Sequence, residues 1–132
     1  VIEFHGNAHR LECLVCHHEE PVQTANFNRR PPKCPQCGQI MKPQVVFFGE
    51  MIPPDALMES QMLANSADAI LVVGTSAVVY PASSIPYMAK QNRAKVIEMN
   101  LERTALTGSI TDVFVQGRVG ETLPRLLEMV IS

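Results

Sequence analysis

The chain has 132 residues, of which 46% are hydrophobic and 18% charged, and its formal net charge is -2. This length suits one domain with a real core, or a small core joined to a metal-stapled module, and makes two full domains a poor fit. No apolar run approaches the roughly 20 residues that cross a bilayer, and there are no long runs of either charge. We therefore expect a soluble, cytoplasmic protein with no membrane partner and no direct nucleic-acid partner.

The nearest approach to a basic patch is formed by Arg29, Arg30 and Lys33, which we interpret as a solvated loop. The chain begins at Val1 inside an apolar stretch, without an initiator methionine, a basic leader or a cleavage site. We therefore expect these residues to be a piece of a longer protein.

Residues 1–8 are predicted to end a strand, and they contain the pair His5-Gly6. Histidine can accept a proton near neutral pH, and a glycine beside it allows another backbone or a ligand to approach closely. Because a lone histidine is more often structural than catalytic, the residues alone leave the role of His5 open.

Residues 9–43 are polar and contain all four cysteines, as Cys13-x2-Cys16, seventeen residues, and Cys34-x2-Cys37. This spacing is typical of a zinc ribbon, in which each pair turns two thiolates toward one metal ion. Two disulfides or a redox-active pair are the alternatives. Two paired turns and the absence of any sign of secretion favour structural zinc.

Four sulfur ligands would close the coordination sphere and leave no position for water, so the predicted metal is structural rather than catalytic. The nearby histidines are then expected to be surface residues and not ligands: His9, His17 and His18.

Residues 44–132 alternate between helical and strand patterns. Pro53-Pro54-Asp55 predicts a helix start, followed by a helix over residues 56–67. The apolar run of residues 69–73, closed by Gly74, predicts a parallel strand buried on both faces. A helix at residues 85–91 and strands at residues 95–99 and 112–115 follow.

The chain is predicted to end in an amphipathic helix, because Leu123, Leu126, Leu127 and Val130 recur at helical spacing. Strand, helix and strand at these distances form a βαβ unit. The expected fold class is α/β, a partial doubly wound (Rossmann-like) parallel sheet with an inserted zinc-ribbon module that has four cysteine ligands. The predicted parts are the strand end at 1–8, the ribbon at 9–43 and the Rossmann-like half-domain at 44–132.

Seven motifs in order along the chain resemble those of the sirtuins, the NAD-dependent protein deacylases. They are VIEFHGN at 1–7, the first Cys-x2-Cys with CPQCG at 34–38, PQVVFFGE at 43–50, GTS at 74–76, VYPA at 79–82, VIEMNL at 96–101 and GRVG at 117–120. The Gly-Ala-Gly-x-Ser loop and the Gln-Asn-Ile-Asp segment of the family's N-terminal half do not occur in these 132 residues.

The resemblance implies roles for particular residues. His5 corresponds to the general base, which takes a proton from the ribose hydroxyls so that the 2′ oxygen can attack the alkylimidate. The substrate peptide would add as a strand beside a cleft to which five residues contribute: Val46, Phe48, Gly49, Glu50 and Val79. Phe48 would line the tunnel for the acyl-lysine.

Gly74 follows a predicted parallel strand, and Asn100 and Glu102 follow the next one, where ligands of open α/β sheets bind. The resemblance assigns the adenosine part of NAD to this edge, with contacts from Gly74, Thr75, Ser76, Asn100, Leu101, Glu102 and Val119. It implies NAD as co-substrate, structural zinc, and an acyl-lysine protein or peptide as partner.

Two further expectations complete the interpretation. The isolated 132 residues should be inactive as a deacylase and should self-associate through an exposed sheet edge. The alternative hypothesis is a non-enzymatic zinc-ribbon module that binds a protein or nucleic-acid partner, for which His5 and the Phe48-Gly49-Glu50 segment would have no use.

Overall fold

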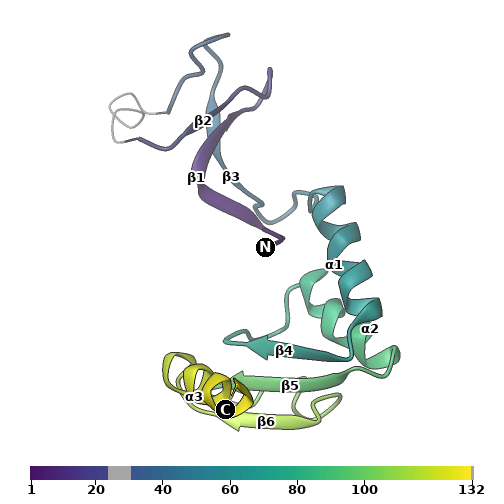
Figure 1. Cartoon of the computed structure of the whole chain (residues 1–132). Helices are drawn as coiled ribbons and strands as arrows, with labels where there is room; N and C mark the ends of the chain where they lie inside the picture. Colours follow the sequence, from purple (N-terminus) through teal and green to yellow (C-terminus); the bar gives the residue numbers. More distant parts are fainter. Residues whose placement is uncertain (24–30, 132) are drawn as a thin grey trace. The chain divides into compact units, whose positions relative to one another are not determined.

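The computed structural model describes residues 1–23 and 31–131, so the predicted loop residues Arg29 and Arg30 lie outside the described part. It divides into two compact units, Val1–Leu57 and Met58–Ser132. The predicted ribbon segment of residues 9–43 lies within the first unit, together with residues 1–8 and 44–57. Figure 1 shows the elements of each unit.

The first unit contains a small antiparallel sheet in the order β2-β1-β3 (Figure 1), formed by β1 (Gly6–Cys13), β2 (Glu19–Pro21) and β3 (Met41–Val45). In the β1–β3 pair, Cys13 lies opposite Met41 and Glu12 opposite Lys42. Among the described residues of this unit, four are buried: Leu11, Cys13, Cys34 and Met41. Two of these four are cysteines, so the unit has very little apolar core apart from its thiol cluster.

The predicted strand at residues 1–8 is wrong in its position, because β1 begins at Gly6. The residues before it form turns, in which Phe4 N–H donates to Ile2 O and Gly6 N–H donates to Glu3 O. Gly6 has a φ of 68° and turns the chain into β1. The strand also pairs with the antiparallel sheet of the first unit rather than with a parallel sheet.

The second unit contains a parallel sheet in the order β4-β5-β6 (Figure 1), formed by β4 (Ala69–Val73), β5 (Lys95–Asn100) and β6 (Val113–Gln116). The helical segments are α1 (Pro54–Ser66), which crosses the division between the units, η2 (Ala82–Ser84), α2 (Ile85–Gln91) and α3 (Val119–Ile131). Helix α2 contacts β4 and β5, and α3 contacts β5. The predicted parallel α/β arrangement is confirmed.

One face of this sheet carries most of the core. Val72 of β4 and Val96 of β5 pack with Leu106 from the loop after β5, and Ile70 joins them. Ala64, Ala89 and Ala94 form an adjoining cluster between α1, α2 and the sheet. The small size of these alanines allows α2 to lie close to β4 and β5.

The prediction that residues 69–73 are buried on both faces is wrong for the described residues. Val72 is buried, but Leu71, which points to the opposite face of the pleat, is 40% exposed. Among the described strands, β4 is paired only with β5 and therefore forms an edge. A continuous apolar run cannot distinguish an edge strand from a central one, because both are compatible with the pattern.

The last helix begins four residues before the predicted Leu123, at Val119. Both the amide and the hydroxyl of Thr122 donate to Arg118 O, and these bonds form the first turn. Pro124 is accommodated inside the helix. Within the described residues, no helix is both long and apolar enough to cross a membrane.

Asp112 joins three parts of the second unit immediately before β6. Its carboxylate accepts hydrogen bonds from Val96 N–H at 2.8 Å and from Lys90 Nζ of α2 at 2.6 Å, with Lys95 Nζ at 3.5 Å. These donors stabilise the charged form, Lys90 most strongly, and lower the pKa of Asp112 to about 2.

We predict that Asp112 stabilises the folded second unit only where it is ionised. Its folded pKa lies below the unfolded value of about 3.9, so the contribution is complete above about pH 5 and is lost as the pH falls toward 2. The measurement is an NMR titration of the Asp112 carboxyl carbon. A midpoint for Asp112 near 3.9 would contradict the ion pair.

Candidate functional site

The four cysteines lie on two turns that have the same pattern of backbone hydrogen bonds. In the first, His17 N–H donates to Cys13 O and Cys13 N–H donates to His18 O; in the second, Gly38 N–H donates to Cys34 O and Cys34 N–H donates to Gln39 O. His17 and Gly38 occupy the same position, and both have a positive φ, 57° and 73°. Each Cys-x2-Cys pair therefore forms the same turn.

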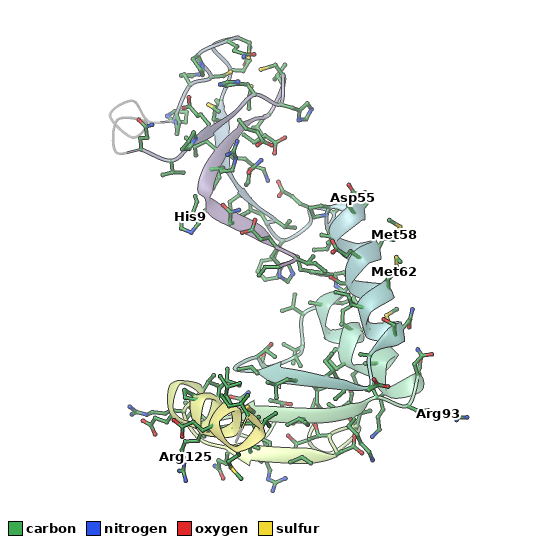
Figure 2. All side chains as sticks on the ribbon, viewed as in Figure 1. His9, Asp55, Met58, Met62, Arg93 and Arg125 are labelled. Carbon is green, nitrogen blue, oxygen red and sulfur yellow. The ribbon has the colours of Figure 1, made fainter. Side chains whose placement is uncertain are left out.

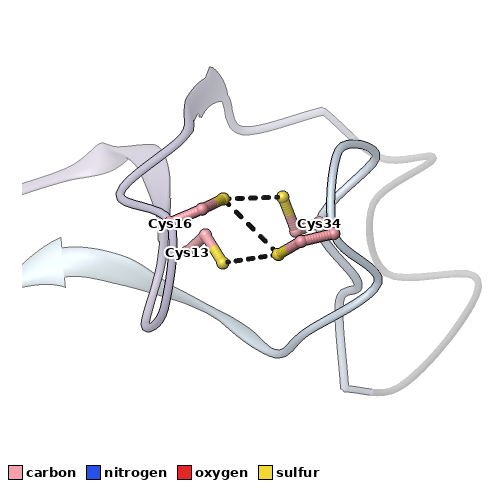
Figure 3. A group of neighbouring side chains, drawn as sticks. Cys13, Cys16 and Cys34 are labelled. Atoms are coloured by element: carbon pink, nitrogen blue, oxygen red, sulfur yellow. Dashed lines mark hydrogen bonds between the residues drawn. The ribbon is translucent and has the colours of Figure 1, made fainter.

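The two turns direct all four sulfurs to one centre (Figure 3). The Sγ–Sγ distances are 3.5 Å for Cys13–Cys37, 3.6 Å for Cys16–Cys34 and 3.4 Å for Cys16–Cys37, and all four atoms lie within 4.8 Å of one another. A disulfide requires about 2.05 Å. Four sulfurs about 2.3 Å from a tetrahedral zinc lie about 3.8 Å apart, so the cluster fits a structural zinc ion.

The electrostatics of the cluster also favour a bound cation. Amides of Cys16 and Val15 donate to the Cys13 sulfur and lower the pKa of this thiol to about 6. The His18 amide acts on Cys16 in the same sense, but the neighbouring sulfurs, first that of Cys37, raise the pKa of Cys16 to about 12. One thiolate thus opposes ionisation of the next, and a divalent ion would remove this repulsion.

The ribbon histidines lie outside this ligand group. Within residues 1–23 and 31–131, the group able to hold a metal consists of the four cysteines alone. His17 Nδ1 lies 2.8 Å from a carboxylate oxygen of Glu12, and His9 is exposed on β1.

His5 lies immediately before β1, with its side chain exposed and its ring edge against Phe4 at a centroid distance of 5.2 Å. The carbonyl of His5 accepts a hydrogen bond from Val46 N–H. A Cβ atom at Gly6 would lie only 1.8 Å from Gln44 O, so the close backbone approach predicted for Gly6 is confirmed. The backbone of His5 is thereby tied to the segment after β3.

The segment that we expect to border the peptide cleft forms a turn after β3. Glu50 N–H donates to Phe47 O, and the Glu50 carboxylate accepts from Phe47 N–H at 3.0 Å and from Lys42 Nζ. Lys42 lowers the pKa of Glu50 and also lies 5.0 Å from the Phe47 ring centroid. Glu50 therefore holds the turn, and Phe48 beside it is 95% exposed.

A pocket in the first unit adjoins this turn. It is lined by residues of β1, β3 and the segment after β3, among them Gly6, Asn7, Lys42, Val46 and Glu50. Of the five predicted substrate residues, Val46 and Glu50 contribute to its wall. The fifth predicted residue, Val79, belongs to the second unit, where its carbonyl accepts from Ser83 N–H before η2.

Three loops meet at the carboxyl edge of the parallel sheet. Asn100 Nδ2 donates to Thr75 O at 2.8 Å, while Asn100 Oδ1 accepts from Leu101 N–H at 2.8 Å. Gln116 Nε2, at the end of β6, donates to Leu101 O at 3.0 Å. Asn100 thus uses both ends of its side-chain amide to join the loop after β4 to the loop after β5.

The remaining predicted nucleotide residues lie at or beside this edge. Gly74 has a φ of 61°, which lets the chain turn away from β4, and the nearest side-chain atom to its missing Cβ is Cγ2 of Val119, at 3.9 Å. Val119 is the first residue of α3. Thr75, Ser76 and Glu102 are exposed. The second unit therefore brings its predicted nucleotide-contacting residues to one edge of the sheet.

Sequence reasoning missed two residues, one in each unit, that hold loop segments in place. Lys42 holds Glu50, and Glu98 is a buried carboxylate in the middle of β5. A signal for Glu98 was present, because a glutamate in an apolar strand is followed by threonines at positions 104, 107 and 111. Nothing in the sequence indicated that their hydroxyls would turn back to that strand.

Comparison with known proteins gives a family match. The model described as the Sir2 family matches residues 1–81. A protein of Thermococcus kodakarensis named NAD-dependent protein deacylase is 47% identical over 136 residues, covering 98% of this chain and 52% of the relative. NAD-dependent protein deacylase 2 of Pyrobaculum aerophilum is 46% identical, covering 98% and 51%. The chain thus spans about half the length of the curated relatives it matches.

Solved structures agree with the fold. A Sir2 homolog–NAD complex superposes with a TM-score of 0.93 at 41% identity, covering 98% of this chain and 50% of that one. A complex of a Sir2 protein with a p53 peptide and NAD+ gives 0.92 at 33% identity, covering 100% and 56%. A third, Sir2Tm bound to a propionylated peptide, gives 0.92 at 32% identity, covering 98% and 56%.

We predict one zinc ion per reduced chain and loss of the first unit's structure when a chelator removes it. A bound metal would take the place of the large apolar core that this unit lacks, so its binding free energy would contribute to folding. Zinc stoichiometry and far-ultraviolet circular dichroism measure the two effects. Cys34→Ser should lower zinc binding strongly, whereas His17→Asn, which tolerates the positive φ, should retain one zinc. Stoichiometry far below one in the unmodified chain would contradict the site.

Proposed function

Because this chain belongs to the Sir2 family, we propose that its whole protein is an NAD-dependent protein lysine deacylase. The acyl group would pass from the lysine side chain to ADP-ribose, with release of nicotinamide. The observation that carries the proposal is that several curated deacylases are 41% or more identical over matches that cover 97–98% of this chain, so the matched region includes both units.

In this proposal the carboxyl edge of β4 and β5 receives the adenosine part of NAD. Ligands of open α/β sheets bind outside the carboxyl ends of the strands, and the exposed Thr75, Ser76 and Glu102 offer hydroxyl and carboxylate groups there. The amide of Asn100 is engaged with Thr75 O and Leu101 N–H, so we assign it to holding the two loops rather than to the ribose.

His5 is proposed as the general base. Its exposed imidazole could take the proton of a ribose hydroxyl once the acyl oxygen has displaced nicotinamide, so that the 2′ oxygen attacks the alkylimidate. The tight approach of Gly6 to Gln44 O and the bond from Val46 N–H to His5 O restrain the backbone that carries the ring.

The acyl-lysine partner is proposed to lie along the segment after β3. Val46 and the turn held by Glu50 would form one side of a β-strand addition site, and the exposed Phe48 would contact the acyl chain. The relatives solved with peptides support this assignment. A cytoplasmic location is also proposed, because four free cysteines placed to hold a zinc ion suit a reducing compartment.

The first experiment on function uses the full-length protein that contains this chain. We expect it to release nicotinamide from NAD in the presence of an acetyl-lysine peptide, and His5→Ala to lower kcat by about 10²–10⁴-fold, the usual contribution of a general base. His9→Ala, an exposed histidine on β1 (labelled in Figure 2), is the matched control and should keep full activity. A protein without NAD-dependent deacylation would contradict the proposal and favour a zinc-ribbon binding module.

The isolated 132 residues should show no deacylation under the same conditions. They span about half of the relatives' length, and among the described strands β4 and β6 are edges, so we also expect concentration-dependent self-association. Nicotinamide release and analytical ultracentrifugation test the two expectations. Activity of the isolated chain that is free of full-length enzyme would contradict the first, and a monomer at all concentrations would contradict the second.

A further inference from the structure

Glu98 is the one buried charged residue in the described core, and nothing in the proposed chemistry uses it. It lies in the middle of β5, opposite Val72 of β4 and Phe114 of β6, and is 1% exposed. It shares its face of the strand with the core residue Val96, two positions earlier. Burial of a carboxylate is costly unless other groups compensate it, so its surroundings decide its role.

Three threonine hydroxyls from the loop after β5 compensate the charge. Thr104 Oγ1 donates to Glu98 Oε1 at 2.5 Å, and Thr107 and Thr111 donate to Oε2 at 2.6 and 2.8 Å. Burial alone would raise the pKa of Glu98, but these donors outweigh it and hold the pKa below its usual value. The carboxylate is therefore charged in the folded protein.

Two of these hydroxyls also accept hydrogen bonds from the loop backbone. Thr104 Oγ1 accepts from Leu106 N–H at 3.1 Å, and Thr107 Oγ1 accepts from Thr104 N–H at 3.0 Å. These two hydroxyls thus donate to Glu98 while they accept from the loop, and they contact different carboxylate oxygens, so a group that accepts at both oxygens satisfies the arrangement. Leu106, inside the same loop, is fully buried against Val72 and Val96.

This loop begins at the carboxyl edge of the sheet. Leu101 and Glu102 are its first residues, and they precede Thr104 closely, with one residue between. Leu101 is held on its other side by Asn100 and Gln116. The path of the two exposed residues is therefore determined at one end by β5 and at the other by the threonines bound to Glu98.

We propose that Glu98 is a positioning residue for nucleotide binding, which acts through Thr104, Thr107 and Thr111 to fix the loop after β5 and so places Leu101 and Glu102 at the carboxyl edge of the sheet. The inference rests on the proposed function, because it assumes that this edge binds the nucleotide. Glu98 itself, being buried, touches neither NAD nor the acyl-lysine.

Glu98→Gln tests the proposal in the full-length protein. Its amide nitrogen would replace a carboxylate oxygen and donate instead of accepting, which leaves at least one threonine hydroxyl without its acceptor and the loop less ordered. We expect the Kd for ADP-ribose and the KM for NAD to rise about tenfold, which corresponds to about 1.4 kcal/mol. The KM for the acetyl-lysine peptide and the kcat at saturating NAD should change less than twofold.

Milder variants keep the test decisive if Glu98→Gln fails to fold. Thr107→Val removes one donor at nearly constant volume and should also raise the Kd for ADP-ribose. Thr107→Ser keeps the hydroxyl, so its Kd for ADP-ribose should equal that of the unmodified protein. Glu59→Gln on α1 makes the same substitution at an exposed glutamate and should leave the Kd unchanged. Amide hydrogen exchange over residues 103–111 should increase in Glu98→Gln and Thr107→Val only.

The outcomes separate this inference from the proposed function. If the unmodified protein binds no ADP-ribose, the proposed function fails and the inference fails with it. If the unmodified protein binds ADP-ribose but Glu98→Gln and Thr107→Val bind it equally well, only the inference is overturned. Equal losses in the Kd for ADP-ribose and in the KM for the peptide would also overturn it, because they would indicate general destabilisation.

Discussion

The hydrogen bonding of β5 is the constraint on which the second unit depends. This central strand pairs along its length with β4 on one side and β6 on the other. One face supplies Val96 and Glu98 to the core, and the buried Met99 lies on the other face. Its last residue, Asn100, bonds through its side chain to the loop after β4 and through its carbonyl to Gly117 N–H. Every loop at the carboxyl edge is thus positioned by reference to this strand.

The first unit depends on a different kind of constraint. Its apolar core is too small to order it, since two of its four buried residues are cysteines. The sheet and the two equivalent Cys-x2-Cys turns instead converge on one metal position. A zinc ion there would connect two segments that are distant in the chain and would replace a hydrophobic core, as in other small metal-stapled modules.

Several polar side chains hold backbone rather than present themselves to a ligand. Glu50 holds the turn that exposes Phe48, Asn100 joins the loop after β4 to the loop after β5, and Glu98 accepts hydrogen bonds from threonines of the loop after β5. These interactions have a common physical basis: irregular backbone leaves amides and carbonyls without regular partners, and a nearby polar side chain satisfies them. The groups that remain exposed at the carboxyl edge, such as Thr75 and Glu102, are then available to a nucleotide.

The sequence by itself determined those features that local chemistry controls. The cysteine spacing predicted the thiol cluster, residues 85–91 were predicted with the bounds of α2, and the apolar runs predicted all three parallel strands. The motifs also indicated the family. Only the tertiary structure decided that β1 begins at Gly6, that β4 is an edge among the described strands, and that Glu98 faces three threonines. These features depend on which segments lie side by side, and a hydropathy pattern specifies that a residue is apolar or polar without specifying its neighbour.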